Sequence, residues 1–325
     1  MRNSATLKTV AVTGSSGFVG RALVERLVRE GATVRATMRQ TRLDAPLGAT
    51  VFGGLDLGNF TDWSASLEGA TAVAHCAARV HVLRESVVDP LAEFRRVNVA
   101  GTLNLARQAV AAGVRRFVFI SSIGVNGAET FDKGFTSEDT PAPHSPYAES
   151  KLEAEVALRQ LAQDTGLEVV IIRPPLVFGP SAPGNFDRLM QALHRGIPLP
   201  FGAVKNKRSL VSLDNLVDLI SICLDHPDAA HQTFMVSDGE DISTTELLKR
   251  TAAALGRPAR LIPVPTGALR AAARALGKAD FAQRLCGSLQ VDISQTRRLL
   301  GWAPVVRLDD ALADTARQFL TRADG

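Results

Sequence analysis

The 325-residue sequence predicts an α/β fold, in which a doubly wound parallel sheet is followed by a smaller mixed C-terminal domain. Three observations predict this fold. Apolar, strand-like runs alternate with helical patterns over the first 175 residues. A glycine-rich turn joins the first of these strands to the first helix. After residue 173, proline and glycine become frequent, which is typical of loops and short elements rather than of a regular α/β repeat.

The elements follow in order along the chain. Runs of apolar and β-branched residues predict strands at 9–13, 33–37, 50–52, 71–76, 116–121 and 168–172. Helical periodicity predicts helices at 20–30, 91–112 and 150–163. Strand–helix–strand units build parallel sheets covered by helices on both faces, so we expect this architecture over residues 1–175. An antiparallel α+β arrangement is the alternative.

The rest of the chain predicts a second domain. A return segment at about 205–236 is expected to bring the chain back to the first domain and its main sheet. The second domain would then comprise residues 176–204 and 237–325. Amphipathic patterns predict its helices at 244–255, 267–277 and 308–320.

Composition and charge exclude several classes of protein. Hydrophobic residues are 46% and charged residues 22%, which argues against disordered and fibrous chains. The net charge of +4 is spread without a block of five like charges, so no nucleic-acid partner is expected. The three cysteines have neither CxxC nor metal-like spacing, which predicts no metal site and favours a cytoplasmic location. No apolar run approaches the about 18–20 residues of a membrane span, so no membrane partner is expected.

A glycine-rich turn predicts dinucleotide binding in the manner of a Rossmann fold. It follows a strand pattern and opens a helix pattern. Gly14, Gly17 and Gly20 are spaced three residues apart. Glycines at this spacing let the backbone turn tightly and approach a pyrophosphate, which then lies at the helix N-terminus. The turn residues expected at the cofactor are Gly14, Ser16, Gly17, Phe18, Val19 and Gly20. A purely structural turn is the alternative.

The end of the second strand bears on the choice between NAD and NADP. An acidic residue about 20 residues after the turn binds the adenosine ribose of NAD. Met38 occupies this place and Arg39 follows it. A guanidinium can bind the additional phosphate of NADP, so the sequence favours NADP, with NAD possible and a solvated surface arginine as the alternative. Asp56, after the third strand, is expected to accept a hydrogen bond from the adenine amino group, unless it only caps a loop or helix.

The single tyrosine of the chain, Tyr147, lies four residues before Lys151. Four residues are about one helical turn, so phenol and ammonium are expected on one helix face. A nearby cation lowers the pKa of a phenol and suits it for acid–base work. Ser121 and Ser122 lie where the fifth strand ends, and a hydroxyl there can polarise a substrate oxygen. A chance YxxxK and a turn serine are the alternatives.

Together these residues resemble the extended short-chain dehydrogenase/reductase superfamily, in its branch with a nucleotide-sugar domain. The likeness covers nearly the whole chain, with further motifs at 75–78, 98–102, 140–147, 208–214 and 292–302. It implies hydride transfer at a sugar carbinol or ketone. Tyr147 would be the general acid/base, Ser122 would polarise the oxygen, and Lys151 would tune the tyrosine and bind the nicotinamide ribose. It also implies a homodimer paired through the helices that hold Asn98 and Lys151.

The resemblance implies two sets of binding residues. Beyond the glycine-rich turn, the cofactor contacts are Arg39, Asp56, Leu57, Ala77, Ala78, Asn98, Ser121, Tyr147, Lys151 and Pro174. The substrate contacts are His81, Ser122, Asn126, Asn185, Arg208 and Arg284, of which the two arginines would meet the diphosphate. A surface-loop role for His81 and helix capping by Asn98 or Asn185 are the alternatives.

Departures from the family pattern discriminate between activities. Ile123 and Gly124 replace the Asp–Glu pair of 4,6-dehydratases, so dehydration is not expected. Asn126 replaces the aromatic residue that 4-epimerases usually carry there, and Leu176 replaces an asparagine that meets the phosphates.

Three enzymatic activities stay open. The main interpretation is a UDP-4-keto-6-deoxy-N-acetylhexosamine 4-reductase of surface polysaccharide biosynthesis, because a reductase consumes reduced cofactor and Arg39 suits NADPH. The alternative is a UDP-glucose or UDP-N-acetylglucosamine 4-epimerase, which returns its hydride and keeps NAD. A ketoreductase of the dihydroflavonol-reductase type is the third, although it leaves Arg208 without a role. A cofactor-sensing protein without chemistry would lack Tyr147 or Lys151.

Overall fold

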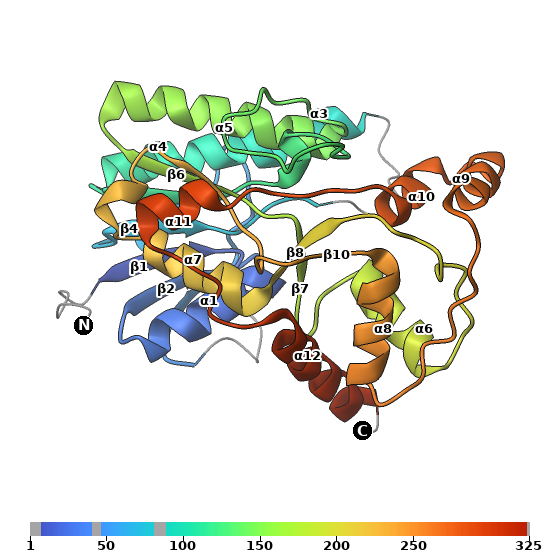
Figure 1. Ribbon diagram of the computed structural model, residues 1–325. Coiled ribbons are helices and arrows are strands. Elements are labelled where there is room, and N and C mark those ends of the chain that lie inside the picture. The colour runs from blue at the N-terminus through green and yellow to red at the C-terminus, as the bar shows by residue number, and fades with distance from the viewer. Residues whose placement is uncertain (1–7, 41–46, 81–88, 324–325) are drawn as a thin grey trace.

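The computed structural model describes residues 8–40, 47–80 and 89–323, and its larger sheet has seven parallel strands (Figure 1). The strand order is β3-β2-β1-β4-β5-β6-β9. The strands are β1 (Thr9–Thr13), β2 (Thr33–Thr37), β3 (Thr50–Phe52), β4 (Ala72–His75), β5 (Arg116–Ile120), β6 (Glu168–Arg173) and β9 (Thr233–Met235). The order reverses between β1 and β4, and ligands of such sheets bind at the carboxyl ends of the strands beside this reversal. The predicted doubly wound sheet is confirmed.

Helices cover both faces of this sheet (Figure 1). One apolar core joins β1 to α1 (Phe18–Arg29) and α7 (Leu213–Cys223). The other core joins β4 and β5 to α4 (Thr102–Ala111) and α5 (Pro146–Thr165). Apolar strands buried on both faces explain why the sequence shows continuous apolar runs instead of alternation.

A second, mixed sheet of three strands lies beside the first, in the order β10-β8-β7. Its strands are β7 (Leu176–Phe178), β8 (Arg208–Ser212) and β10 (Asp241–Ile242). A third apolar core packs it against α6 (Asn185–His194), α8 (Thr244–Ala254) and α12 (Leu308–Ala323). The other short helices are α2 (Ser64–Leu67), η2 (Ile123–Val125), η3 (Pro227–Ala229), α9 (Thr266–Ala275), α10 (Ala279–Cys286) and α11 (Ser294–Leu300).

The return of the chain to the larger sheet differs from the expectation in one respect. The strand β8 does not rejoin the main sheet, because it pairs in parallel with β7 and antiparallel with β10. The return is made by α7, which packs on the main sheet, and by β9, which pairs with β6. The division of the chain into two domains stays a prediction.

The single helix expected at 91–112 is interrupted. It consists of α3 (Pro90–Phe94), a π-helical stretch η1 (Arg95–Gly101) and α4. A π-helix makes i→i+5 hydrogen bonds, and such insertions are frequent at functional sites. Sequence periodicity did not reveal this interruption.

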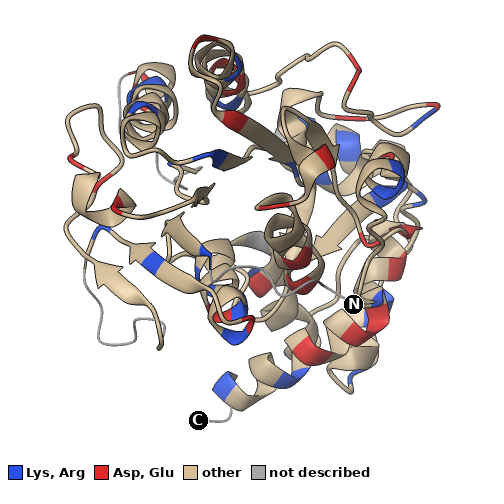
Figure 2. Cartoon of the chain, turned by 90° about the vertical axis from the view of Figure 1, so that its left-hand side faces the viewer, with Lys and Arg blue, Asp and Glu red and all other residues tan. Residues whose placement is uncertain are grey.

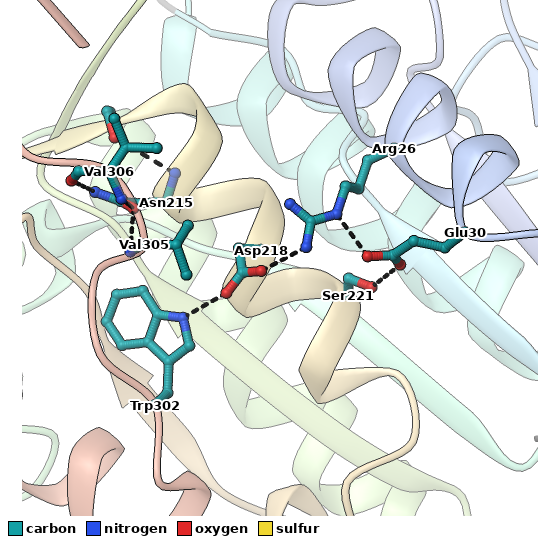
Figure 3. Close-up of polar contacts among 9 residues, drawn as sticks. Arg26, Glu30, Asn215, Asp218, Ser221, Trp302, Val305 and Val306 are labelled. Carbon is teal, nitrogen blue, oxygen red and sulfur yellow. Dashed lines mark hydrogen bonds and ion pairs between the residues drawn. The ribbon is translucent and has the colours of Figure 1, made fainter. Parts of the chain in front are cut away.

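Polar contacts fasten α7 to α1 and to the C-terminal segment (Figure 3). Arg26 donates to the Asp218 carboxylate at 2.5 Å, and the indole Nε1 of Trp302 donates to the other oxygen of the same carboxylate at 2.9 Å. Asn215 joins α7 to the backbone of Val305 and Val306. These contacts hold the C-terminal end of α1, where Arg26 lies, against α7.

Basic and acidic residues are interspersed along the chain and share the same helices (Figure 2). Within the described residues, no helix is both long and apolar enough to cross a bilayer. The same part of the chain contains no group of three or more His, Cys, Asp or Glu side chains that could hold a metal ion.

Candidate active site

The glycine-rich turn packs the backbone closely against itself and against the segment after β4 at the start of α1. Gly14 has φ +66°, and its carbonyl accepts a hydrogen bond from the Gly17 N–H at 2.8 Å. A Cβ on Gly20 would lie 2.2 Å from the Gly14 oxygen, and one on Gly14 would lie 2.8 Å from the Ala77 nitrogen. No side chain caps α1, so its first N–H groups face the turn as donors for an anion.

A cavity of about 380 Å³ extends from this turn along the carboxyl ends of the strands. Eight of the expected cofactor contacts line it, namely Gly14, Ser16, Gly17, Arg39, Asp56, Leu57, Ala77 and Ala78. A larger cavity of about 630 Å³ lies on the other side of the turn, between α1, α7 and α12. Ser122, Tyr147 and Lys151 line neither cavity. The smaller cavity lies at the strand-order reversal, where ligands of such sheets bind. The glycine turn without a side-chain cap and the carboxylate of Asp56 are suited to an adenine dinucleotide.

The end of β2 carries Met38 and Arg39, the two residues on which the choice between NAD and NADP depended. The Met38 side chain is buried, whereas Arg39 is exposed at the edge of the cavity. Asp56 accepts a hydrogen bond from the Leu57 N–H at 3.0 Å, and its own carbonyl accepts one from Thr61 Oγ1 at 2.6 Å. Arg79 and Arg96 also line this cavity, and Arg96 is paired with Glu93. The exposure of the Arg39 guanidinium does not by itself indicate a bound phosphate.

The helix α5 begins just before the tyrosine. Ser145 caps it by accepting a hydrogen bond from the Ala148 N–H, and Pro146 opens the first turn. Tyr147 therefore lies in the first turn, with its ring edge-on to Phe94 at a centroid distance of 5.9 Å. Lys151 is buried one turn later. Its ammonium donates to the Ile120 carbonyl at 2.8 Å and lies 4.4 Å from the centroid of the Phe119 ring.

The electrostatics of this pair differ from the expectation. Burial raises the pKa of Tyr147 to about 12, although we expected Lys151 to lower it. Burial also lowers the pKa of Lys151 to about 7, against the attraction of Glu155. Desolvation has a larger effect on the pKa of the phenol than the charge of Lys151 has. The reason is that the ammonium contacts the Ile120 carbonyl and the Phe119 ring of β5 instead of the phenol.

A titration of the single tyrosine can test this result. We expect the ligand-free protein to show little phenolate absorbance near pH 10, where an exposed phenol is about half ionised, and to ionise only towards pH 12. The unfolded chain releases this proton first, so stability is lost as the pH rises from about 10 to 12. The Tyr147→Phe variant, which lacks the chromophore, serves as the blank. A midpoint at or below pH 10 would contradict burial as the dominant influence.

The two strand-end serines have different partners. Ser121 is buried and its hydroxyl donates to the Glu155 carboxylate at 2.5 Å. Ser122 is only partly buried, and its hydroxyl oxygen accepts a hydrogen bond from the Gly124 N–H at 3.1 Å. The Ser122 hydroxyl therefore keeps its proton available for a substrate oxygen, whereas that of Ser121 is committed within the protein.

Comparisons with known proteins agree with this geometry. The sequence profile of the NAD dependent epimerase/dehydratase family matches residues 10–237. The chain belongs to this family. It is 46% identical over 315 residues to a UDP-glucose 4-epimerase of Vibrio cholerae, covering 96% of each chain. The structure of MoeE5 in complex with UDP-glucose and NAD is similar with TM-score 0.77 and 27% identity, over 98% of this chain and 100% of that one. The UDP-glucose 4-epimerase of Thermotoga maritima, with UDP-glucose, has TM-score 0.76 and 21% identity, over 97% and 99%.

Membership in the epimerase/dehydratase family confirms the resemblance to the extended short-chain dehydrogenases, and the protein is an NAD-dependent enzyme. The family match and the NAD-bound relative do not support the expected preference for NADP. The roles of the individual site residues stay predictions.

Asn98 lies in the π-helical stretch and supports the cavity from outside its wall. Its amide accepts from the Arg79 N–H at 2.8 Å and donates to the Arg79 carbonyl at 3.0 Å. It also donates to the Ser150 hydroxyl on α5. Asn98 thus joins the loop after β4 to the helix that holds Tyr147. Pro174, after β6, accepts a hydrogen bond from the Ile123 N–H.

The described substrate residues that we expected come from several elements, and only Arg208 lies on a strand. Arg208 donates to the backbone carbonyls of Arg284 and Gly287, so the two expected diphosphate residues are neighbours, although the Arg284 side chain is exposed. Burial lowers the pKa of Arg208 from its ordinary value. Asn185 is the first residue of α6, but its side chain lies outside the described part of the structure, as does His81 entirely.

A buried ionic network was missed by the sequence reasoning. Arg173, at the end of β6, donates twice to the Glu155 carboxylate, at 2.9 and 2.5 Å. The same guanidinium donates to Asn126, whose amide in turn donates to the Thr136 carbonyl. The amide of Asn126 is thus used within the protein. The available signal was a glutamate one helical turn after Lys151, on the buried face of α5.

Proposed function

We propose that the enzyme is an NAD-dependent 4-epimerase of a UDP-hexose, UDP-glucose or UDP-N-acetylglucosamine. The observation that carries the proposal is the 46% identity to a UDP-glucose 4-epimerase over 96% of both chains. The reductase interpretation rested on Met38 and Arg39. Because Arg39 is exposed at the edge of the cavity, it does not outweigh this relative.

The residues of the site suit this reaction. Bound NAD would supply reversible hydride acceptance. Tyr147 would take the proton of the sugar 4-hydroxyl and return it, while Ser122 donates a hydrogen bond to the same oxygen. Lys151 has a pKa near 7 in the ligand-free site, so a small change in its surroundings changes its protonation. In its protonated form it would favour the phenolate of Tyr147. Arg208 and Arg284, together at the second sheet, would bind the diphosphate.

Two further features belong to the proposal. Residues 176–204 and 237–325 would hold the nucleotide sugar, as a domain distinct from the one that binds NAD. Two subunits would pair through the helices carrying Asn98 and Lys151, where Val156 on α5 exposes 59% of its surface. Exposed apolar side chains on a helix face are suited to such an interface.

Product analysis tests the activity. Incubation with UDP-glucose or UDP-N-acetylglucosamine should give the 4-epimer by NMR, with no net change in nicotinamide absorbance. Incubation with a UDP-4-keto-6-deoxy-aminosugar and NADH or NADPH provides the matched arm. Stoichiometric oxidation of the reduced cofactor in that arm, without epimer formation in the first, would overturn the epimerase in favour of the reductase.

A further inference from the structure

The helices α9 and α10 form a hairpin at the end of the molecule opposite the N-terminus (Figure 1). The helix α9 packs on α10, and none of its ten residues is buried. The base of the hairpin is fixed to the rest of the protein, because Arg208 donates to the Arg284 carbonyl at 2.7 Å. Thr244 likewise donates to the Leu285 carbonyl at 2.6 Å. The tip, where α9 passes into α10, is therefore the part that is open to a partner.

Two large apolar side chains at this tip are exposed to water. Leu276, directly after α9, is 72% exposed, and Phe281, in the first turn of α10, is 49% exposed. They are five positions apart at the turn of one hairpin, so a partner at the tip can cover both. Exposed apolar side chains that lie together mark sites of interaction with proteins or membranes.

Positive charge accompanies the two apolar side chains. Residues 266–286 hold one acid, Asp280, and four basic residues, Arg270, Arg274, Lys278 and Arg284. This short segment thus carries three of the four net positive charges of the whole chain. Arg274 and Lys278 lie two positions before and after Leu276, and both are exposed. The tip of the hairpin is therefore apolar and basic at the same time.

An anionic bilayer surface is complementary to both features. Its headgroups carry negative charge, which attracts lysine and arginine, and leucine and phenylalanine side chains are stable at the boundary between headgroups and acyl chains. A protein partner matches the tip less well, because a specific interface buries about 800 Å² on each side. Two side chains at a narrow tip present much less apolar surface than that.

We propose that the tip of the α9–α10 hairpin docks on membranes that contain anionic phospholipids. Leu276 and Phe281 enter the boundary between headgroups and acyl chains, and Arg274 and Lys278 meet the lipid phosphates. The sequence reasoning expected no membrane partner, but it considered only spanning segments, which binding at the surface does not need. The proposal is independent of the proposed reaction, because none of these four residues belongs to the expected catalytic or binding site.

Vesicle binding tests this surface with the full chain. Vesicles of equal parts phosphatidylglycerol and phosphatidylcholine should co-sediment the protein, whereas vesicles of phosphatidylcholine alone should leave most of it in solution. Binding should weaken as salt is added, because ions screen the attraction between the basic side chains and the headgroups. Protein that stays in solution with both kinds of vesicle at low ionic strength would overturn the proposal.

Two double variants locate the contact on the hairpin. Leu276→Ser/Phe281→Ser removes the apolar side chains, and Arg274→Gln/Lys278→Gln removes two charges. Each should bind the anionic vesicles about 10- to 100-fold more weakly than the wild-type protein, as the loss of two apolar or two charged contacts implies. Binding by both variants that equals that of the wild-type protein would place the contact elsewhere and overturn the proposal.

Matched controls make the same changes at other exposed positions. Leu47→Ser/Phe60→Ser changes two apolar side chains that are each 92% exposed, and Arg317→Gln/Arg322→Gln removes two charges from α12. Both should bind the anionic vesicles as the wild-type protein does, and an equal loss in these controls would contradict a contact at the hairpin. Sedimentation equilibrium provides the last arm. Self-association that is lost in the apolar hairpin variant would assign the tip to a second copy of the chain and overturn the proposal.

Discussion

Replacing Tyr147 by Phe should lower kcat for epimerisation by about 10²- to 10⁴-fold, the usual contribution of a general acid/base. The change removes one oxygen from a side chain in the first turn of α5. Its ring contact with Phe94 does not depend on that oxygen. Initial rates with UDP-glucose, followed by product NMR, measure the effect.

Binding measurements separate this loss from a structural defect. The Tyr147→Phe variant should keep the wild-type thermal midpoint and bind NAD within about 3-fold, because the hydroxyl makes no described hydrogen bond in the ligand-free protein. Retention of the full turnover rate by the variant would show that another group moves the proton.

Replacing Glu155 by Gln should destabilise the protein by about 3–5 kcal/mol, the cost of leaving one partner of a buried ion pair uncompensated. Both partners are almost fully buried, with side-chain exposures of 1% for Glu155 and 3% for Arg173. The substitution also weakens the hydrogen bond from the Ser121 hydroxyl. Urea denaturation gives the change in the free energy of unfolding.

The matched control is Glu153→Gln, two residues earlier on the same helix. Glu153 pairs with Arg95, but their side chains are 33% and 46% exposed. Water and salt screen such a pair, so its loss should cost less than about 1 kcal/mol. Equal losses in the two variants would show that the buried pair contributes no more than an exposed one.

The local parts of the site were predictable from short stretches of sequence. The turn at Gly14–Gly20 requires glycine for steric reasons that act within a few residues, and the structure confirms the tight turn through the φ of Gly14 and the contact at Gly20. The helical spacing of Tyr147 and Lys151 is equally local, since both lie on α5 one turn apart.

Contacts between distant segments were not predictable in the same way. Arg173, Glu155 and Asn126 come from β6, α5 and the loop after β5, and only the packed sheet brings them together. The pKa of Tyr147 was expected to fall but rises, because burial is a property of the packed site and not of the YxxxK spacing.

By itself, the sequence determined the doubly wound sheet, the glycine turn and the pair of Tyr147 and Lys151, because each depends on local periodicity and steric requirements. The family followed from the resemblance that these motifs carry. Only the tertiary structure decided that β8 leaves the main sheet, that the Glu155–Arg173 pair lies beneath the active site, and that no residue of α9 is buried. These features depend on strand pairing and desolvation, to which residues far apart in the chain contribute jointly.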